Sequence, residues 1–188
     1  MESLAGQLID GGATVIQYRD KRSSTRDLYR NALILRRVTR DGKIPLIVND
    51  RVDIALAVEA DGIHIGQDDM PVEVIRTLAP DLTVGLSVSS LDDFAGSPEP
   101  DYYGLGALYS TDTKTVFEVP GVALVRAIRK WTVRPLIGIG GINATNAGEA
   151  ILAGCDGVAV ISAILGGDNA EQATRSLRKC VDDSRTDS

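Results

Sequence analysis

The sequence predicts an α/β fold of the TIM (β/α)8-barrel type, and three observations carry this prediction. Short apolar segments rich in Val and Ile alternate along the chain with longer segments of helical period. The short segments are apolar almost throughout, which is typical of parallel strands covered on both faces. Polar residues capable of chemistry follow every predicted strand, whereas an open doubly wound sheet would gather its site at one switch point.

Seven strands and the helices between them follow from these patterns. The predicted strands are Thr14–Tyr18, Pro45–Val48, Gly62–Ile65, Thr83–Leu86, Tyr102–Leu105, Pro135–Ile139 and Gly157–Ile161. The main predicted helices are Ser3–Asp10, Ser24–Arg40, Asp53–Glu59, Val122–Trp131, Asn143–Ala153 and Ala170–Val181. Because a helix precedes the first predicted strand, we expect an eight-stranded barrel that lacks its first strand at the N-terminus. No linker-like segment interrupts the pattern, so residues 1–188 are predicted to form a single domain.

Local capping signals mark two of these helices. Ser24 followed by Asp27, and Thr145 followed by Glu149, indicate capping near the helix starts.

Composition excludes several classes of protein. The chain is 44% hydrophobic and 24% charged with a formal net charge of −6, as in ordinary globular domains. It has no basic run and only 4% aromatic residues, so no nucleic-acid partner is expected. No apolar run approaches the roughly 20 residues of a membrane span, and no signal-peptide pattern opens the chain. Cys155 and Cys180 fit no metal-ligand spacing and predict reduced thiols, so we expect a cytoplasmic protein.

Cationic side chains follow the first predicted strand. Strand alternation puts Gln17, Arg19 and Lys21 on one side of the chain. A planar guanidinium and a point-charge ammonium together suit a diphosphate. The alternative is a solvated strand end that carries surface ion pairs.

Carboxylates follow the next two predicted strands. Asp50 comes directly after one strand and Asp69 lies in the loop after its neighbour. Hard oxygen ligands at adjacent strand ends suit Mg²⁺ held together with substrate phosphates. Taken singly, each carboxylate could instead cap a helix or stabilise a turn. His64, the one histidine of the chain, lies inside a predicted strand and receives no catalytic role.

Glycine-rich segments end the last two predicted strands and indicate phosphate binding. Gly138–Asn143 and Gly157–Ser162 let backbone N–H groups approach an anion closely. Barrels often bind phosphate with the loops after their last two strands. The segment Ser110–Lys114 adds hydroxyls and a lysine, which suit a phosphate clasp or a simple polar surface loop.

In order and spacing, these segments resemble the thiamine-phosphate synthase family, whose near relative is the thiazole tautomerase. The segments that carry the resemblance are Gln17-x-Arg19-x-Lys21, Asn49-Asp50-Arg51-Val52-Asp53, Ala60-Asp61-Gly62-Ile63-His64-Ile65-Gly66-Gln67-x-Asp69, Gly85-x-Ser87, Thr111-x-Thr113-Lys114 and Gly138-Ile139-Gly140-Gly141-Ile142.

The resemblance implies a transferase that joins a hydroxymethylpyrimidine diphosphate to a thiazole phosphate and releases pyrophosphate. It implies that the diphosphate is held by Arg19, Lys21, Asn49 and Lys114, and Mg²⁺ by Asp50 and Asp69. It further implies that Gln17 and Ser87 contact the pyrimidine. The thiazole phosphate would be held by Thr111, Thr113, Gly140, Gly141, Ile161 and Ser162.

The chain departs from the family pattern in two places besides the absent strand. Ser89 stands where the family often has a histidine, which is the expected proton-transfer group of the tautomerase. Ala107 and the segment Tyr109–Asp112 stand where prolines are common.

Three alternatives to an active synthase stay open. They are a non-catalytic or truncated phosphate-binding barrel, a tautomerase-like protein, and another phosphate-handling barrel such as an isomerase. Whether the chain forms a homo-oligomer is also left open.

Overall fold

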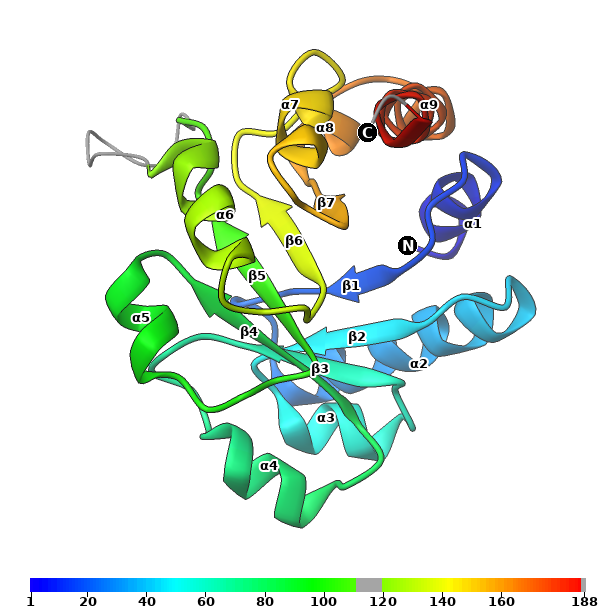
Figure 1. Ribbon diagram of the computed structural model, residues 1–188. Helices are drawn as coiled ribbons and strands as arrows, with labels where there is room; N and C mark the ends of the chain where they lie inside the picture. The colour runs from blue at the N-terminus through cyan, green and yellow to red at the C-terminus, as the bar shows by residue number, and fades with distance from the viewer. Residues whose placement is uncertain (111–119, 187–188) are drawn as a thin grey trace.

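Seven parallel strands form one curled sheet in which each strand pairs with the next along the chain, as Figure 1 shows. The computed structural model describes residues 1–110 and 120–186. The strands are β1 (Ile16–Tyr18), β2 (Leu46–Asn49), β3 (Gly62–Ile65), β4 (Thr83–Val88), β5 (Tyr102–Gly106), β6 (Leu136–Ile139) and β7 (Gly157–Ala159). All seven predicted strands are therefore confirmed, with β7 ending at Ala159 rather than at Ile161.

Helices surround the sheet on its outer side (Figure 1). They are α1 (Glu2–Asp10), α2 (Thr25–Asp41), α3 (Val52–Ala57), α4 (Val72–Leu78), α5 (Leu91–Gly96), α6 (Gly121–Arg129), α7 (Ala147–Leu152), α8 (Ser162–Leu165) and α9 (Ala170–Thr186). Helices α4, α5 and α8 were not among the main helices predicted. Within the two described ranges, no helix is long and apolar enough to cross a membrane.

The sheet does not close into a ring, which confirms the expected barrel without its first strand. Strands β1 and β7 are the two ends of the strand order, and neither has a second neighbour among the strands described. Helices α1 and α9 pack against each other, so they join the two ends of the sheet on the outside. Leu8 of α1 contacts both apolar clusters of the core, one built on β1–β4 and the other on β5–β7.

Of the two predicted helix caps, the one at Ser24 is confirmed and the one at Thr145 is wrong. The Ser24 hydroxyl accepts a hydrogen bond from the Asp27 N–H at 3.2 Å, as expected for the start of α2. Helix α7, however, begins after Asn146 and not near Thr145. The reason is that Asn143 accepts from both the N–H (2.8 Å) and the hydroxyl (2.6 Å) of Thr145. Those bonds use Thr145 in a turn before the helix.

An aspartate precedes every second strand and fastens it to the strand before. Its backbone N–H donates to the carbonyl of a residue at the start of that strand, and its carboxylate accepts from the N–H of the same residue. An arginine from the helix before the first strand of the pair (α2, α4 or α6) pairs with the carboxylate. We call these groups Asp–Arg clamps. Each is given as strand residue, aspartate and arginine: Leu46, Asp61 and Arg36; Val84, Asp101 and Arg76; Leu136, Asp156 and Arg129.

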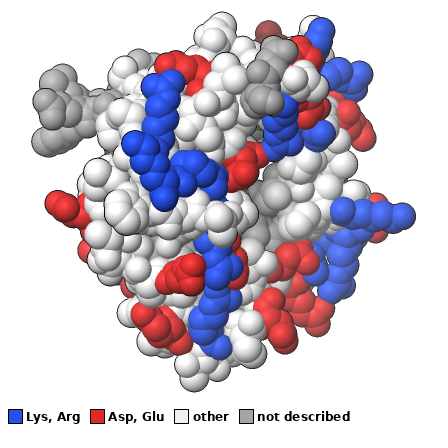
Figure 2. Space-filling view, viewed as in Figure 1, with Lys and Arg blue, Asp and Glu red and all other residues white. Residues whose placement is uncertain are grey.

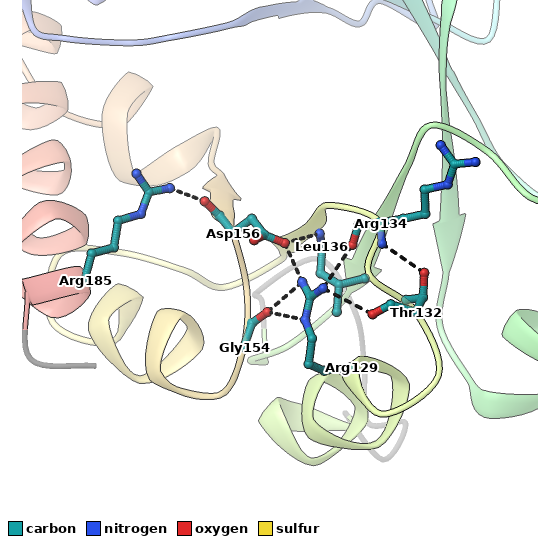
Figure 3. A network of polar contacts seen from close by, with 7 residues as sticks. All are labelled: Arg129, Thr132, Arg134, Leu136, Gly154, Asp156 and Arg185. Atoms are coloured by element: carbon teal, nitrogen blue, oxygen red, sulfur yellow. Dashed lines mark hydrogen bonds and ion pairs between the residues drawn. The ribbon is translucent and has the colours of Figure 1, made fainter.

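The third clamp is part of a larger network of polar contacts, which Figure 3 shows. Arg129 donates to the Gly154 carbonyl at 3.0 and 2.9 Å and to the Arg134 carbonyl at 3.1 Å, besides its ion pair with Asp156. Arg185 of α9 donates to the Asp156 carbonyl. This network lies at the amino ends of β6 and β7, the rim opposite to the polar loops that follow the strands.

The clamp at Asp101 predicts a pH dependence of stability. Burial pushes the pKa of Asp101 upward, but the Arg76 ion pair and the Val84 N–H outweigh it, so the pKa is lowered. A carboxyl whose pKa is lowered in the folded state stabilises the protein at pH values above the ordinary carboxyl pKa. This stabilisation is lost as the pH falls through the lowered pKa.

We therefore expect Asp101→Asn to reduce the free energy of unfolding by about 1 kcal/mol at neutral pH. The difference from wild type should shrink as pH falls below the ordinary carboxyl range and through the lowered pKa of Asp101. Urea unfolding from neutral to acidic pH measures this difference. Asp81→Asn is the control, because exposed Asp81 has no ion pair among the described residues. A difference that stays constant with pH would contradict the role given to the carboxylate.

Candidate functional site

Polar residues from neighbouring strands gather at the carboxyl-end rim of the sheet. In a parallel sheet all strands end at the same rim, so residues far apart in sequence meet there. Gln17 of β1 donates from Nε2 to Oδ1 of Asn49, at the end of β2, at 2.9 Å. Gln67, in the loop after β3, donates to the Ser87 carbonyl of β4 at 2.7 Å. These bonds tie the end of β1 to that of β2, and the loop after β3 to the end of β4.

Asp50 and Asp69 form a carboxylate pair at this rim. Burial, followed by the hydrogen bond and the negative charge of Asp69, raises the pKa of Asp50, and Lys21 opposes this shift. The Lys21 Nζ lies 3.3 Å from Oδ2 of Asp50. Asp69 is oriented by the Gly66 N–H, which donates to its Oδ2 at 2.7 Å. The structure thus brings together the two carboxylates that the sequence pointed to for a metal.

The carboxylate pair suits a divalent cation. Two carboxylates in contact repel each other when both are ionised, and a cation between them removes that repulsion. Within the described ranges, no group of three or more His, Cys, Asp or Glu side chains gathers to form a metal site. A pair of carboxylates fits Mg²⁺, which commonly takes one or two protein carboxylates and completes its shell with water and substrate phosphates.

The cationic residues of the β1 loop are accessible at the rim. Gln17 and Arg19 are exposed and Tyr18 between them is buried, as alternation predicts. Arg19 makes no ion pair with any residue that the structure describes, so its guanidinium is available to an anion. On the face in Figure 2, basic and acidic side chains are interspersed.

His64 is a buried residue with both ring nitrogens engaged. Its Nδ1 lies 2.9 Å from the Tyr102 hydroxyl and its Nε2 lies 2.8 Å from Oγ of Ser87. Burial lowers the pKa of His64 to about 4, so the imidazole is neutral near pH 7. Sequence reasoning missed Tyr102. The Tyr102 ring occupies the space beside Gly85, where a Cβ would lie 2.0 Å from it, and this contact is visible only in the structure.

The glycines after β6 pack directly against the loop after β5. Gly140 and Gly141 have φ values of +88° and +66°, which favour glycine. A Cβ on Gly140 would lie 2.6 Å from the Ala107 Cβ, and one on Gly141 would lie 2.6 Å from the Tyr109 carbonyl oxygen. The Tyr109 N–H donates to the Gly140 carbonyl at 3.1 Å. The glycine segment after β6 therefore lies against Ala107 and Tyr109, the described residues that follow β5.

Tyr109 also ties its loop to helix α7. Its hydroxyl donates to the Glu149 carboxylate at 2.9 Å. Burial, and then this carboxylate, raise the pKa of Tyr109 to about 12. The hydroxyl therefore stays protonated at physiological pH and keeps donating this bond.

The remaining predicted residues lie beyond β7 or outside the described ranges. Ile161, with 64% of its surface exposed, precedes α8, and Ser162 is the first residue of that helix. Thr111, Thr113 and Lys114 lie outside the described residues.

Comparisons with known proteins agree on one family. A family model described as thiamine monophosphate synthase matches residues 1–164. A thiamine-phosphate synthase from Chloroflexus aurantiacus is 48% identical over 176 residues, covering 92% of this chain and 82% of that protein. A solved structure, a thiamine phosphate pyrophosphorylase from Pyrococcus furiosus, has a TM-score of 0.87 at 40% identity and covers 97% of this chain and 90% of its own.

A more distant structure shares the fold alone. Phosphoribosyl anthranilate isomerase from Thermotoga maritima has a TM-score of 0.71 at 17% identity, covering 97% of this chain and 95% of its own.

Proposed function

Because the chain belongs to the thiamine monophosphate synthase family, we propose that it is a transferase that makes thiamine phosphate. It joins 4-amino-2-methyl-5-hydroxymethylpyrimidine diphosphate to a thiazole phosphate and releases pyrophosphate. The observation that carries the proposal is the Asp50–Asp69 carboxylate pair with Lys21 at one rim, beside the Gln17–Asn49 bond. This combination of two carboxylates and one ammonium would fit a divalent cation that links the carboxylates to an anionic substrate.

The diphosphate end of the substrate would lie over β1 and β2. Arg19 and Lys21 supply positive charge, Asn49 supplies an amide, and Lys114 from the loop after β5 adds a second ammonium. Asp50 and Asp69 would hold Mg²⁺, which when bound neutralises charge on the diphosphate oxygens. Gln17 and Ser87 would face the pyrimidine ring, because each lies one strand away from the carboxylate pair.

The chemistry needs no protein nucleophile. The C–O bond to the diphosphate breaks with its electron pair going to oxygen, which leaves a resonance-stabilised pyrimidine methyl cation. The thiazole nitrogen then donates its lone pair to that carbon and closes the new C–N bond. Charge grows on the leaving diphosphate as the bond breaks, so the fixed cations stabilise the transition state more than the ground state.

The thiazole phosphate would lie at the other side of the rim. The loops after β5, β6 and β7 would hold it through Thr111, Thr113, Gly140, Gly141, Ile161 and Ser162. The support for this placement is the left-handed backbone of the two glycines, which leaves N–H groups at a strand end without covering side chains.

The tautomerase alternative has less support. Ser89 stands at the position of the expected proton-transfer histidine, and its hydroxyl donates to the Asp93 carboxylate at 2.7 Å. A serine engaged in this way is a poor proton-transfer group near neutral pH. A cytoplasmic location, and the presence or absence of a homo-oligomer, stay predictions.

The proposed function is tested by a product assay on the 188-residue chain. We expect thiamine phosphate and pyrophosphate to form from the two substrates with Mg²⁺, and product to fall to background with excess EDTA. Offering a thiazole phosphate tautomer alone is the matched test of the alternative. A folded protein that makes no thiamine phosphate with Mg²⁺ would overturn the proposal, and isomerisation of the lone thiazole would favour the tautomerase.

A further inference from the structure

Three polar side chains form a partly buried hydrogen-bonded chain across β3, β4 and β5. The Tyr102 hydroxyl contacts Nδ1 of His64, and Nε2 of His64 contacts Oγ of Ser87, at 2.9 and 2.8 Å. His64 is only 4% exposed. These hydrogen bonds therefore run from Tyr102, through the buried His64, to Ser87, the residue proposed to face the pyrimidine.

Two glycines make room for this chain. His64, Gly85 and Tyr102 lie in one row across the three strands, by the strand register. Because Gly85 has no side chain, the Tyr102 ring extends over β4 to reach His64. Gly104, the register partner of Ser87, would place a Cβ 2.7 Å from Cε1 of His64. A Cβ at Gly85 would collide with the Tyr102 ring, and one at Gly104 would collide with the His64 ring. Glycine at these two positions therefore leaves the space that the hydrogen-bonded side chains occupy.

The direction of the hydrogen bonds follows from the available donors and acceptors. Among the described residues, His64 Nδ1 is the one polar partner of the Tyr102 hydroxyl. A phenol donates to an imidazole nitrogen readily, and a bond in the opposite direction would leave the hydroxyl hydrogen without an acceptor. Nδ1 therefore accepts, and the single hydrogen of the neutral ring lies on Nε2.

The hydrogen on Nε2 sets what Ser87 offers to a ligand. Nε2 donates to Oγ of Ser87, so the serine's own hydrogen is not used within the chain. The Ser87 carbonyl is held separately by Nε2 of Gln67. With its backbone held and one lone pair occupied, the serine hydroxyl is left as a donor that points away from His64.

We infer that His64, set by Tyr102, is a positioning residue that makes Ser87 a hydrogen-bond donor toward a ring nitrogen of the pyrimidine substrate. This inference rests on the proposed function for its ligand. The site would select a heteroaromatic ring that presents a nitrogen lone pair to Ser87. A ring with an N–H or C–H at that place would leave the serine hydrogen unpaired, which disfavours its binding.

The first test is independent of activity and reads the tautomer directly. His64 is the one histidine of the chain, so ¹⁵N-imidazole NMR of the labelled protein needs no assignment. We expect the Nε2–H tautomer in the wild type and a mixture of tautomers in Tyr102→Phe. A wild-type spectrum dominated by the Nδ1–H tautomer would overturn the inference, even if the protein proves to be an active synthase.

The second test is a double-mutant cycle on steady-state kinetics. We expect Tyr102→Phe to raise KM for the pyrimidine diphosphate about fivefold, with KM for the thiazole phosphate unchanged. In a Ser87→Ala background, the same substitution should have no further effect, because His64 acts through Ser87. Tyr103→Phe is the matched control, since the Tyr103 ring packs against Phe94 of α5 and not against His64.

Each kinetic outcome decides between a positioning and a purely structural role. Equal shifts in both KM values, or the same factor in the Ser87→Ala background, would mean that Tyr102 and His64 only support the fold. A wild type that makes no thiamine phosphate would instead refute the proposed function. In that case the NMR experiment still decides whether the hydrogen bonds run from Tyr102 to Ser87.

Discussion

Asp50→Asn should lower kcat at saturating Mg²⁺ and substrates by at least about 100-fold, with the fold intact. The substitution removes one charge from the carboxylate pair, and the leaving diphosphate then loses the cation that the pair would hold. Asparagine suits this position because Asp50 has a φ of +62°, a conformation that asparagine tolerates and alanine does not. Asp69→Asn should have an effect of the same size.

The fold should survive because these two carboxylates repel each other. Burial and the contact with Asp69 raise the pKa of Asp50, so neutralising either partner relieves an unfavourable contact. We expect the free energy of unfolding to change by less than about 0.5 kcal/mol. Asp68→Asn, at an exposed position beside Asp69, is the control and should leave kcat unchanged. Turnover near the wild-type rate in both Asp50→Asn and Asp69→Asn would refute the metal assignment.

Gly141→Ala should weaken binding of the thiazole phosphate and also destabilise the fold. The added Cβ would lie 2.6 Å from the Tyr109 carbonyl oxygen, at a residue whose φ is +66°. Relief of this overlap would push the loop after β5 away from the loop after β6. We expect KM for the thiazole phosphate to rise at least about tenfold, and the free energy of unfolding to fall by about 2 kcal/mol.

Gly167→Ala is the matched control for this prediction. A Cβ on Gly167 would meet no heavy atom within 4 Å, so stability and kinetics should stay close to wild type. KM for the pyrimidine diphosphate provides an internal reference, since that substrate would lie over β1 and β2. Thermal or urea unfolding and steady-state kinetics measure both effects. An unchanged KM for the thiazole phosphate in a folded Gly141→Ala protein would argue against a phosphate site at these glycines.

The fold class and every strand were predictable because parallel strands covered on both faces are apolar runs, which a sequence shows directly. Short helices were harder. Helices α4, α5 and α8 span only seven, six and four residues and were missed, whereas α3 and α7, of six residues each, were predicted within longer segments. The cap at Asn146 was missed for another reason. Asn146 accepts from the Asn143 N–H and Asn143 accepts from the Thr145 N–H, and a sequence with three such polar residues in four positions does not show which of them accepts.

The candidate site was predictable in its residue types and only partly in its contacts. The position of Asp50 and Asp69 after neighbouring strands was enough to predict that they meet at one rim. The role of Tyr102 was not predictable in this way, because its hydroxyl contacts His64 from two strands away and across Gly85. That contact depends on strand register and on the space that a glycine leaves.

The Asp–Arg clamps divide the molecule into modules of two strands. They join β2 to β3, β4 to β5 and β6 to β7. Among the described residues, no clamp of this kind joins β1 to its neighbour β2. All three lie at the amino ends of the strands, away from the substrate rim. Each clamp spans a helix, a strand, the next helix and the start of the next strand, so an exchange of two consecutive αβ units would keep a clamp whole, whereas an exchange of one unit would split it. An exchange of one pair of consecutive helix–strand units would therefore preserve these contacts, and substitutions in the loops at the opposite rim would leave all three clamps intact.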